Sequence, residues 1–191
     1  MIKLIAGLGN PGRQYEKNRH NAGFLFLDHL LDSCGGSWSS ESKFHGIVAS
    51  SHVGGEKVIF LKPQAFMNRS GLSVGSVARY YKFKVDEILI VHDELDLSVG
   101  VVKLKKGGGH AGHNGLRDIM TNLGEKDFYR VRLGIGRPVS GRPVADYVLS
   151  NPSKEEFSMM LSAFDLIDLQ INKIVAGNVA AAMNELNKSS G

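Results

Sequence analysis

Ionisable side chains follow directly after two apolar segments of the chain. The first segment, residues 2–8, leads into a polar loop that carries Asn10 and His20. The second, residues 87–91, is followed by HDELD, which contains Asp93. A carboxylate beside an imidazole fixes the tautomer of the ring and stabilises its protonated form, as general acid-base chemistry requires. Asp93 is therefore a candidate for orienting a histidine.

Further histidines follow a glycine loop. Residues 107–109 are glycines, and His110 and His113 come next. Imidazole and carboxylate groups bind divalent metals, so these histidines could form a metal site with the HDELD segment. Their spacing is not a recognised ligand pattern, and histidines on such a loop can also contact phosphate or be plain polar loop residues. The further ligands of such a site would be His92, Asp93 and Asp96.

The segment GLGNPG at 7–12 matches the G-x-G-x-x-G pattern of dinucleotide-binding loops. That use of the pattern requires a helix that opens at the glycines, with its N-terminus facing a pyrophosphate. Pro11 and the polar residues 13–21 show no apolar periodicity. We therefore interpret residues 7–12 as a loop whose glycines set its conformation and which presents polar side chains. The competing non-enzyme hypothesis is that this loop belongs to a nucleotide- or RNA-binding module.

The segment GLSVG at 71–75 matches the G-x-S-x-G pattern of serine hydrolases. Ser73, Asp93 and a histidine at 110 or 113 also follow the chain order of an α/β-hydrolase triad. A nucleophile elbow is a tight turn between a strand and a helix, however, whereas Ser73 falls inside a helix predicted over 70–81. We expect these small residues to allow close helix packing, and a serine hydrolase acting on small esters is the competing enzyme class.

Basic residues flank the acidic segment. The formal net charge is only +4, but residues 86–98 contain five acidic and no basic side chains, and both neighbouring stretches are basic. Lysines and arginines at alternate positions of two predicted strands would face one side, which suits a phosphate backbone without reading its sequence. The members of this cluster are Lys103, Lys105, Lys106, Arg117, Arg130 and Arg132.

The composition is that of an ordinary globular protein. The chain has 191 residues, 42% of them hydrophobic and 22% charged, so we expect one domain over 1–191. It has no apolar run of eighteen residues, and its single cysteine, Cys34, cannot form an internal disulfide. We therefore expect a cytoplasmic protein that does not span a membrane.

Apolar runs and turn residues predict alternating strands and helices, and hence an α/β sandwich around a mixed sheet. A hairpin joined at Gly54-Gly55 argues against an all-parallel sheet. Ser153 and Glu156 form a capping box before a long C-terminal helix. We expect its apolar stripe to lie in the core; the stripe is Phe157, Met160, Leu161, Phe164, Ile167 and Ile171. The predicted strands are 2–8, 46–53, 56–62, 87–91, 101–106 and 129–136, and the predicted helices begin near Asn21, at Ser70, at Leu116 and after Ser153.

Four long motifs occur in order: GLGNPGRQYEKNRHNAG, KPQAFMNRSG, HDELDLSVG and KKGGGHAGHNGLRD. Together they resemble the bacterial-type peptidyl-tRNA hydrolase family from Ile2 to about Leu149. The resemblance implies a three-layer α/β/α sandwich around a mixed, mostly parallel sheet, with C-terminal helices. It also implies a monomeric, metal-independent esterase without a cofactor or an obligate protein partner. Such an enzyme cleaves the ester between a peptide and the 3′ ribose of tRNA, and so recycles tRNA from peptidyl-tRNA that ribosomes release.

The same resemblance assigns roles to individual residues. His20 is similar to the catalytic base, Asp93 to the carboxylate that orients it, and Asn10 to the residue that distinguishes blocked from free aminoacyl ends. Lys105 and Arg132 resemble a clamp on the tRNA 5′ phosphate, with Lys103 and Arg130 as weaker additions. The remaining implied substrate or tRNA contacts are Tyr15, Phe66, Met67, Asn68, His113 and Asn114, of which His113 is given no proton transfer.

Overall fold

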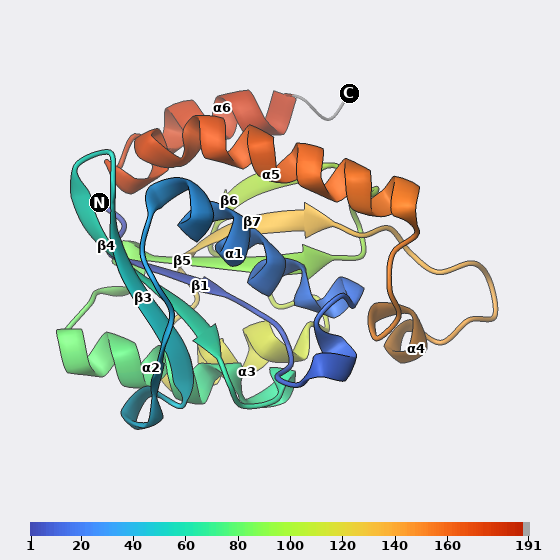
Figure 1. Ribbon diagram of the computed structural model, residues 1–191, viewed down its shortest axis with the longest axis horizontal. Helices are drawn as coiled ribbons and strands as arrows, with labels where there is room; N and C mark the ends of the chain where they lie inside the picture. Colours follow the sequence, from blue (N-terminus) through green and yellow to red (C-terminus); the bar gives the residue numbers. More distant parts are fainter. Residues whose placement is uncertain (189–191) are drawn as a thin grey trace.

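A computed structural model describes residues 1–188 of the chain and shows a seven-stranded mixed sheet between layers of helices (Figure 1). The strand order is β2-β3-β4-β1-β5-β7-β6. Strands β4, β1, β5 and β7 run parallel, whereas β2, β3 and β6 pair antiparallel with their neighbours. The strands are β1 (Leu4–Gly7), β2 (Ser39–Glu41), β3 (Gly46–Val53), β4 (Glu56–Pro63), β5 (Ile88–Glu94), β6 (Val102–Lys106) and β7 (Tyr129–Gly134).

Helices cover both faces of the sheet, which confirms the expected three-layer α/β/α arrangement. In Figure 1 helices α1, α5 and α6 lie above the sheet, and α2 and α3 lie below it. The short α4 lies at the end toward which the parallel strands point (Figure 1). The helices are α1 (Ala22–Cys34), α2 (Ser70–Tyr81), α3 (Asn114–Leu123), α4 (Val144–Val148), α5 (Lys154–Val175) and α6 (Val179–Lys188).

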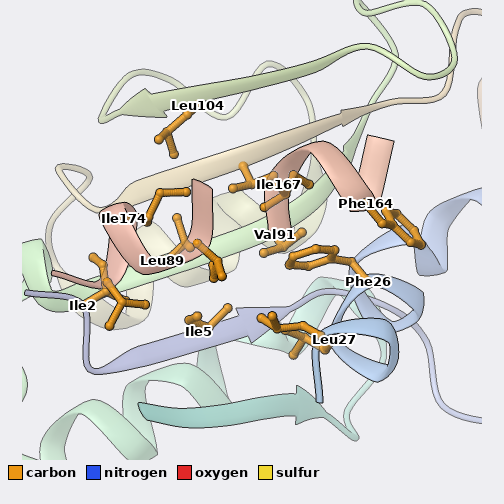
Figure 2. Close-up of a cluster of buried hydrophobic side chains, with 14 of the residues drawn as sticks. Ile2, Ile5, Phe26, Leu27, Leu89, Val91, Leu104, Phe164, Ile167 and Ile174 are labelled. Atoms are coloured by element: carbon orange, nitrogen blue, oxygen red, sulfur yellow. The ribbon is translucent and has the colours of Figure 1, made fainter. Parts of the chain in front are cut away.

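The larger hydrophobic core lies between the sheet and the layer of α1, α5 and α6 (Figure 2). Ile5 and Leu89 project from adjacent parallel strands, and both are fully buried. Phe26 of α1 meets Phe164 of α5 with the ring centroids 5.5 Å apart. Burying side chains of this size contributes about 1.5–3 kcal/mol each, so this core fixes the sheet whose strand ends carry the polar residues.

The local signals in the sequence are largely confirmed. Strands β3 and β4 form the expected antiparallel hairpin, and the capping box of Ser153 and Glu156 opens α5. Most of the α5 stripe is buried, but Leu161 is 39% exposed and was wrongly placed in the core. One residue advances the helix by about 100°, so the position after buried Met160 turns toward solvent.

Some elements differ from the expected bounds. Strand β5 continues through Asp93 to Glu94, so the HDE residues are themselves part of the sheet. Helix α3 begins at Asn114, two residues early, because the side chain of His113 caps it. Strand β2 and helix α4 were not expected, since three exposed residues and a five-residue helix show no clear periodicity. Within residues 1–188, no helix is both long and apolar enough to cross a membrane.

Candidate active site

His20 and Asp93 meet at the carboxyl ends of the central strands. Asp93 lies near the end of β5, and His20 lies in a 3₁₀ turn (Arg19–Asn21) just before α1. The Nδ1 atom of His20 is 2.8 Å from Oδ2 of Asp93. A carboxylate only accepts, so Nδ1 carries the proton and donates it. The Nε2 atom of His20 is thereby left as an unprotonated base at the edge of a cavity.

A second histidine donates to the same carboxylate. The Nε2 atom of His113 is 2.8 Å from Oδ1 of Asp93, the oxygen that His20 does not use. On the other side of the ring, Nδ1 of His113 accepts the backbone N–H of Leu116 at 3.4 Å. This cap at the start of α3 requires an unprotonated Nδ1 and therefore fixes the neutral tautomer of His113.

Burial and neighbouring charge shift the pKa values of His20 and Asp93 in opposite directions. Burial lowers the pKa of His20, but the negative charge and hydrogen bond of Asp93 raise it by more, so it lies above its ordinary value. Burial raises the pKa of Asp93, and its contacts with His20 and His113 lower it well below the usual range. Asp93 therefore stays ionised, and His20 is a stronger base than a free imidazole.

His92 supports this arrangement from within the sheet. Its Nδ1–H donates to the backbone carbonyl of Asp93 at 2.8 Å, and its ring packs edge-on to that of His113 at 5.1 Å. The side chain is buried, and its Nε2 has no hydrogen-bond partner in the described chain. Burial, followed by the neighbouring His113, lowers the pKa of His92 to about 3, so this ring is neutral under ordinary conditions.

Asn10 is held by three hydrogen bonds that leave one group free. Its backbone N–H donates to Oδ1 of Asn21, and its backbone carbonyl accepts from Nδ2 of Asn21, both at 2.9 Å. Its side-chain Oδ1 accepts the backbone N–H of Met67 at 2.7 Å. The acceptor of the Asn10 amide is thus occupied, and its Nδ2–H groups can donate into the cavity that Asn10 lines.

A cavity of about 640 Å³ joins these residues to others that the sequence singled out. Phe66 is 56% exposed at its mouth. Tyr15 lies outside the lining but packs edge-on against Phe66, with the ring centroids 6.4 Å apart. Among the expected site residues, the lining contains Asn10, His20, Phe66, Met67, Asn68, Asp93, Lys105, His113, Asn114, Arg130 and Arg132.

The basic residues do not all face the cavity in the same way. Lys105 and Arg132 line it, and Nε of Arg132 donates to Glu94 at 2.8 Å. Lys103 is not part of the lining. Arg130 is almost fully buried, and it donates to the backbone carbonyls of Gly108 and Gly109 at 2.7 and 2.6 Å. Arg130 also lines the cavity while its guanidinium holds the glycine loop, and its expected role as a weaker addition to the phosphate clamp stays a prediction.

Arg19 ties the His20 turn to a segment 130 residues away. Its Nη2 forms a 2.7 Å ion pair with Glu156, and its Nη1 donates to Oγ of Ser150 at 2.6 Å and to the carbonyl of Asn151 at 3.0 Å. The guanidinium also lies over the ring of Tyr147 at 4.2 Å. The loop before His20 is thereby fastened to the segment between α4 and α5.

The two pattern-based alternatives lack their structural context. Ser73 is fully buried inside α2, and its Oγ donates to the carbonyl of Phe44 at 2.6 Å, so it cannot be a nucleophile at an elbow. After Gly12 the chain forms a 3₁₀ turn (Arg13–Tyr15), and α1 begins only at Ala22. The G-x-G-x-x-G glycines therefore shape a loop rather than open a helix.

The metal-site alternative brings together a different set of residues. His20, Asp93 and His113 each offer a ligand atom, and these atoms lie within 4.8 Å of one another. The proposed ligand His110 instead accepts from the backbone of Gly112, and Asp96 pairs with Arg137. The two nitrogens that face Asp93 each direct a proton at an oxygen, so a cation there would have to displace both hydrogen bonds.

Comparisons with known proteins decide the family. The family model described as peptidyl-tRNA hydrolase matches residues 4–191. The chain belongs to the peptidyl-tRNA hydrolase family. A peptidyl-tRNA hydrolase of Methylococcus capsulatus is 49% identical over 97% of this chain and 99% of its own length. One from Bordetella parapertussis is 48% identical over the whole of this chain and 90% of its own length.

A solved structure supports the same family assignment. The crystal structure of peptidyl-tRNA hydrolase from Acinetobacter baumannii matches with a TM-score of 0.94 and 45% identity, over 97% of this chain and 94% of that chain. The match to the peptidyl-tRNA hydrolase model extends over every segment that lines the cavity, since it begins at residue 4 and runs to the end of the chain. The mixed sheet and its flanking helices are thus a peptidyl-tRNA hydrolase fold.

The amino-acid sequence assigned no supporting role to four residues of this site, Arg19, Asn21, His92 and Glu94, of which His92 was named only as a possible metal ligand. The side chain of Asn21 accepts the backbone N–H of Asn10, and the carboxylate of Glu94 accepts from Nε of Arg132. His92 and Arg19 adjoin Asp93 and His20 in the chain, and that adjacency was the one signal available. Neither adjacency nor residue type reveals the direction of a side chain, which is why these contacts were not foreseen.

Proposed function

We propose that this protein hydrolyses the ester bond between a peptide, or an N-blocked amino acid, and the 3′ ribose of tRNA. Membership of the peptidyl-tRNA hydrolase family supports the reaction. The observation that carries the mechanism is the 2.8 Å contact of His20 Nδ1 with Asp93, which leaves Nε2 of a strengthened base beside the cavity.

In the proposed reaction His20 activates a water molecule. Nε2 takes a proton from the water as its oxygen attacks the ester carbonyl, and Asp93 stabilises the imidazolium that forms. When the tetrahedral intermediate collapses, the C–O bond to the ribose breaks and His20 returns the proton to the leaving oxygen. The products are a peptide carboxylic acid and tRNA with a free 3′ hydroxyl. An alkoxide leaves more easily than an amine, so no covalent nucleophile is needed.

Asn10 provides the selectivity for blocked ends. Its free Nδ2–H groups can donate to a peptide carbonyl next to the ester, whereas an unblocked aminoacyl end presents an ammonium group that cannot accept. A site built to donate there loses a required hydrogen bond with the wrong substrate, which can cost large factors in rate. Asn68 and Asn114, exposed at the cavity, would bind the peptide backbone without reading side chains.

The acceptor end of tRNA would enter across the basic and aromatic parts of the rim. Lys105 and Arg132, which line the cavity, would bind the 5′ phosphate, and Lys103, outside the lining, would be a weaker addition. Phe66 and Tyr15 supply ring faces for contact with tRNA or peptide, and Met67 forms a wall of the cavity.

The proposed chemistry uses only these side chains, so we expect activity without a metal or other cofactor. We also propose that the enzyme acts as a cytoplasmic monomer that recycles tRNA from peptidyl-tRNA released by ribosomes. His113 supports Asp93 in this scheme and transfers no proton, because its Nδ1 is used to cap α3.

The test compares release of tRNA from N-acetyl-aminoacyl-tRNA and from free aminoacyl-tRNA, in EDTA. We expect wild type to cleave only the blocked substrate rapidly, and His20→Ala to lose that activity. Labelling with a serine-reactive fluorophosphonate should fail while activity is retained. If folded wild type cleaves neither substrate, the proposed reaction is wrong, and activity lost specifically in EDTA would overturn the metal-free mechanism.

A further inference from the structure

A second groove lies along the edge of the sheet formed by β2 and β3, and it shares no lining residue with the His20 cavity. It has a volume of about 470 Å³, and its lining includes Tyr81 and Phe83 at the C-terminal end of α2. Its apolar lining includes Phe44, Val48, Ile59, Tyr81 and Phe83. The polar part of the lining contains Lys3, Lys43, Lys57, Glu41 and three serines, so cations outnumber carboxylates three to one.

Aromatic rings continue from this groove onto the exposed surface. Tyr81 stacks on Phe83 with the centroids 5.3 Å apart and the planes 12° apart. Tyr80 packs edge-on against Tyr81 at 4.9 Å and against Phe44 at 5.2 Å. Tyr80 is 60% exposed and Tyr81 is 43% exposed. The aromatic cluster of Phe44, Tyr80, Tyr81 and Phe83 thus extends beyond the groove, and its tyrosine rings are exposed to solvent.

Cations accompany these rings. Nζ of Lys43 lies 4.5 Å from the ring centroid of Tyr80 and 4.9 Å from that of Phe44. The sequence at 79–84, RYYKFK, alternates cations with aromatic residues. None of Lys43, Lys57, Arg79, Lys82 and Lys84 forms an ion pair within residues 1–188, whereas Lys3 pairs with Glu87 at 2.7 Å.

From this combination we propose that the groove and its aromatic extension bind single-stranded RNA, separately from the acceptor end in the cavity. Stacked bases need exposed rings, and the connecting phosphates need unpaired cations at similar spacing. An acidic peptide would use the lysines but would have no bases to stack on Tyr80 and Tyr81. A single nucleotide would fill the groove but leave the ring of Tyr80 and the cations of 79–84 unused.

This surface serves a purpose different from that of the Lys105 and Arg132 side chains. The groove shares no lining residue with the His20 cavity, so RNA bound there does not need a free 3′ end. The enzyme would hold an unpaired stretch of RNA while the cavity remains open to substrate. Binding should be electrostatic in part and weaken as salt rises, with bases contributing through stacking.

The probe is a fluorescent twelve-nucleotide oligouridine with a 3′ phosphate, titrated against full-length protein at two salt concentrations. Lys43→Gln/Lys57→Gln removes two solvent-facing cations, and Tyr80→Ala/Tyr81→Ala removes two rings. The matched control, Lys126→Gln/Lys173→Gln, removes two exposed lysines elsewhere. We expect roughly tenfold weaker binding for each groove variant, and a smaller salt dependence only where the lysines are lost.

Unchanged thermal unfolding of the lysine variant and unchanged cleavage of a minimal N-blocked ester would show that fold and cavity are intact. Because this readout is binding, its result is independent of whether the proposed esterase reaction is correct. Equal affinity of the groove variants and wild type would overturn the proposal, as would an equal loss in the control variant. Binding of AMP in the groove without competition by the oligouridine would also reject single-stranded RNA as its occupant.

Discussion

His113 donates its Nε2–H to Oδ1 of Asp93 at 2.8 Å, on the carboxylate oxygen opposite the one that His20 contacts. One buried carboxylate therefore accepts from two imidazoles. Each donor stabilises the negative charge of Asp93. Because the hydrogen bond from His113 already stabilises that charge, Asp93 raises the proton affinity of His20 by less than it would alone. His113 is thus a positioning residue that acts on His20 through Asp93.

Replacing His113 should change the pH dependence of activity. In His113→Leu, Asp93 keeps His20 as its one imidazole donor, so the pKa of His20 should rise further. The acid limb of kcat/KM should therefore move to higher pH, with several-fold lower activity at pH 6. His113→Gln retains a donor and should lie closer to wild type. The measurement is a pH profile with an N-blocked minimal ester. An equal loss at every pH in both variants would indicate a structural role only.

The wild-type profile itself should show a histidine base of raised pKa. The base must be unprotonated, so activity falls as pH drops through the His20 pKa, which Asp93 holds above its ordinary value. Asp93→Asn cannot stabilise the imidazolium, so kcat should fall by about 10²–10⁴ and the acid limb should shift to lower pH. A profile whose acid limb is the same in wild type and Asp93→Asn would contradict this pairing.

His92 should make the fold sensitive to acid. Its pKa is about 3 in the folded protein, compared with about 6.5 when unfolded. Between these values the unfolded chain binds a proton that the folded chain does not, so the stability contribution is present above pH 6.5 and is lost as pH falls toward 3. The slope is up to about 1.4 kcal/mol per pH unit.

The measurement is urea unfolding from pH 7 to pH 4 for wild type and His92→Gln. Glutamine keeps a donor for the carbonyl of Asp93 but does not titrate, so the variant should lose less stability on acidification. It can be less stable than wild type at pH 7, and only the difference in slope matters. Parallel stability curves for the two proteins would argue against a buried neutral His92.

Arg132 and Glu94 give a pair of substitutions with opposite expected effects. Arg132→Ala, like Lys105→Ala, should weaken tRNA engagement and flatten its salt dependence, with cleavage of a short minimal ester nearly intact. Glu94→Gln removes the carboxylate that Arg132 contacts at 2.8 Å and should therefore tighten tRNA binding. KM is compared on the two substrates at two salt concentrations. Equal losses on both substrates in Arg132→Ala would count against a phosphate contact.

Arg19 should matter for both stability and catalysis. Its side chain is 8% exposed and pairs with Glu156, so Arg19→Met leaves a partly buried carboxylate and several backbone carbonyls without their donor. We expect a loss of roughly 3 kcal/mol in the free energy of unfolding, and a lower kcat because the His20 turn is loosened. Arg19→Lys should recover part of both effects. Urea unfolding and kcat are measured together, and wild-type values in Arg19→Met would remove Arg19 as an anchor.

The amino-acid sequence determined the elements and the neighbourhood of the site. Apolar runs identified the buried strands, Gly54-Gly55 marked the hairpin, and Ser153 with Glu156 marked the start of α5, because each of these signals depends on residues close together in the chain. Polar residues after β1 and within HDELD placed Asn10, His20 and Asp93 at one edge of the sheet, since parallel strands end together.

Tertiary structure alone decided which partner each of these side chains meets. His113 reaches Asp93 because the chain turns at Ala111 and Gly112, both with positive φ, and then starts α3. Arg130 and Arg132 share one face of β7, but the guanidinium of Arg130 donates to the glycine loop, whereas that of Arg132 donates to Glu94. Arg19 contacts residues about 130 positions away. A hydrogen bond depends on the exact distance and direction between two atoms, and residue type and spacing in the chain do not encode these. Burial depends on the periodicity of apolar residues, which the sequence does encode.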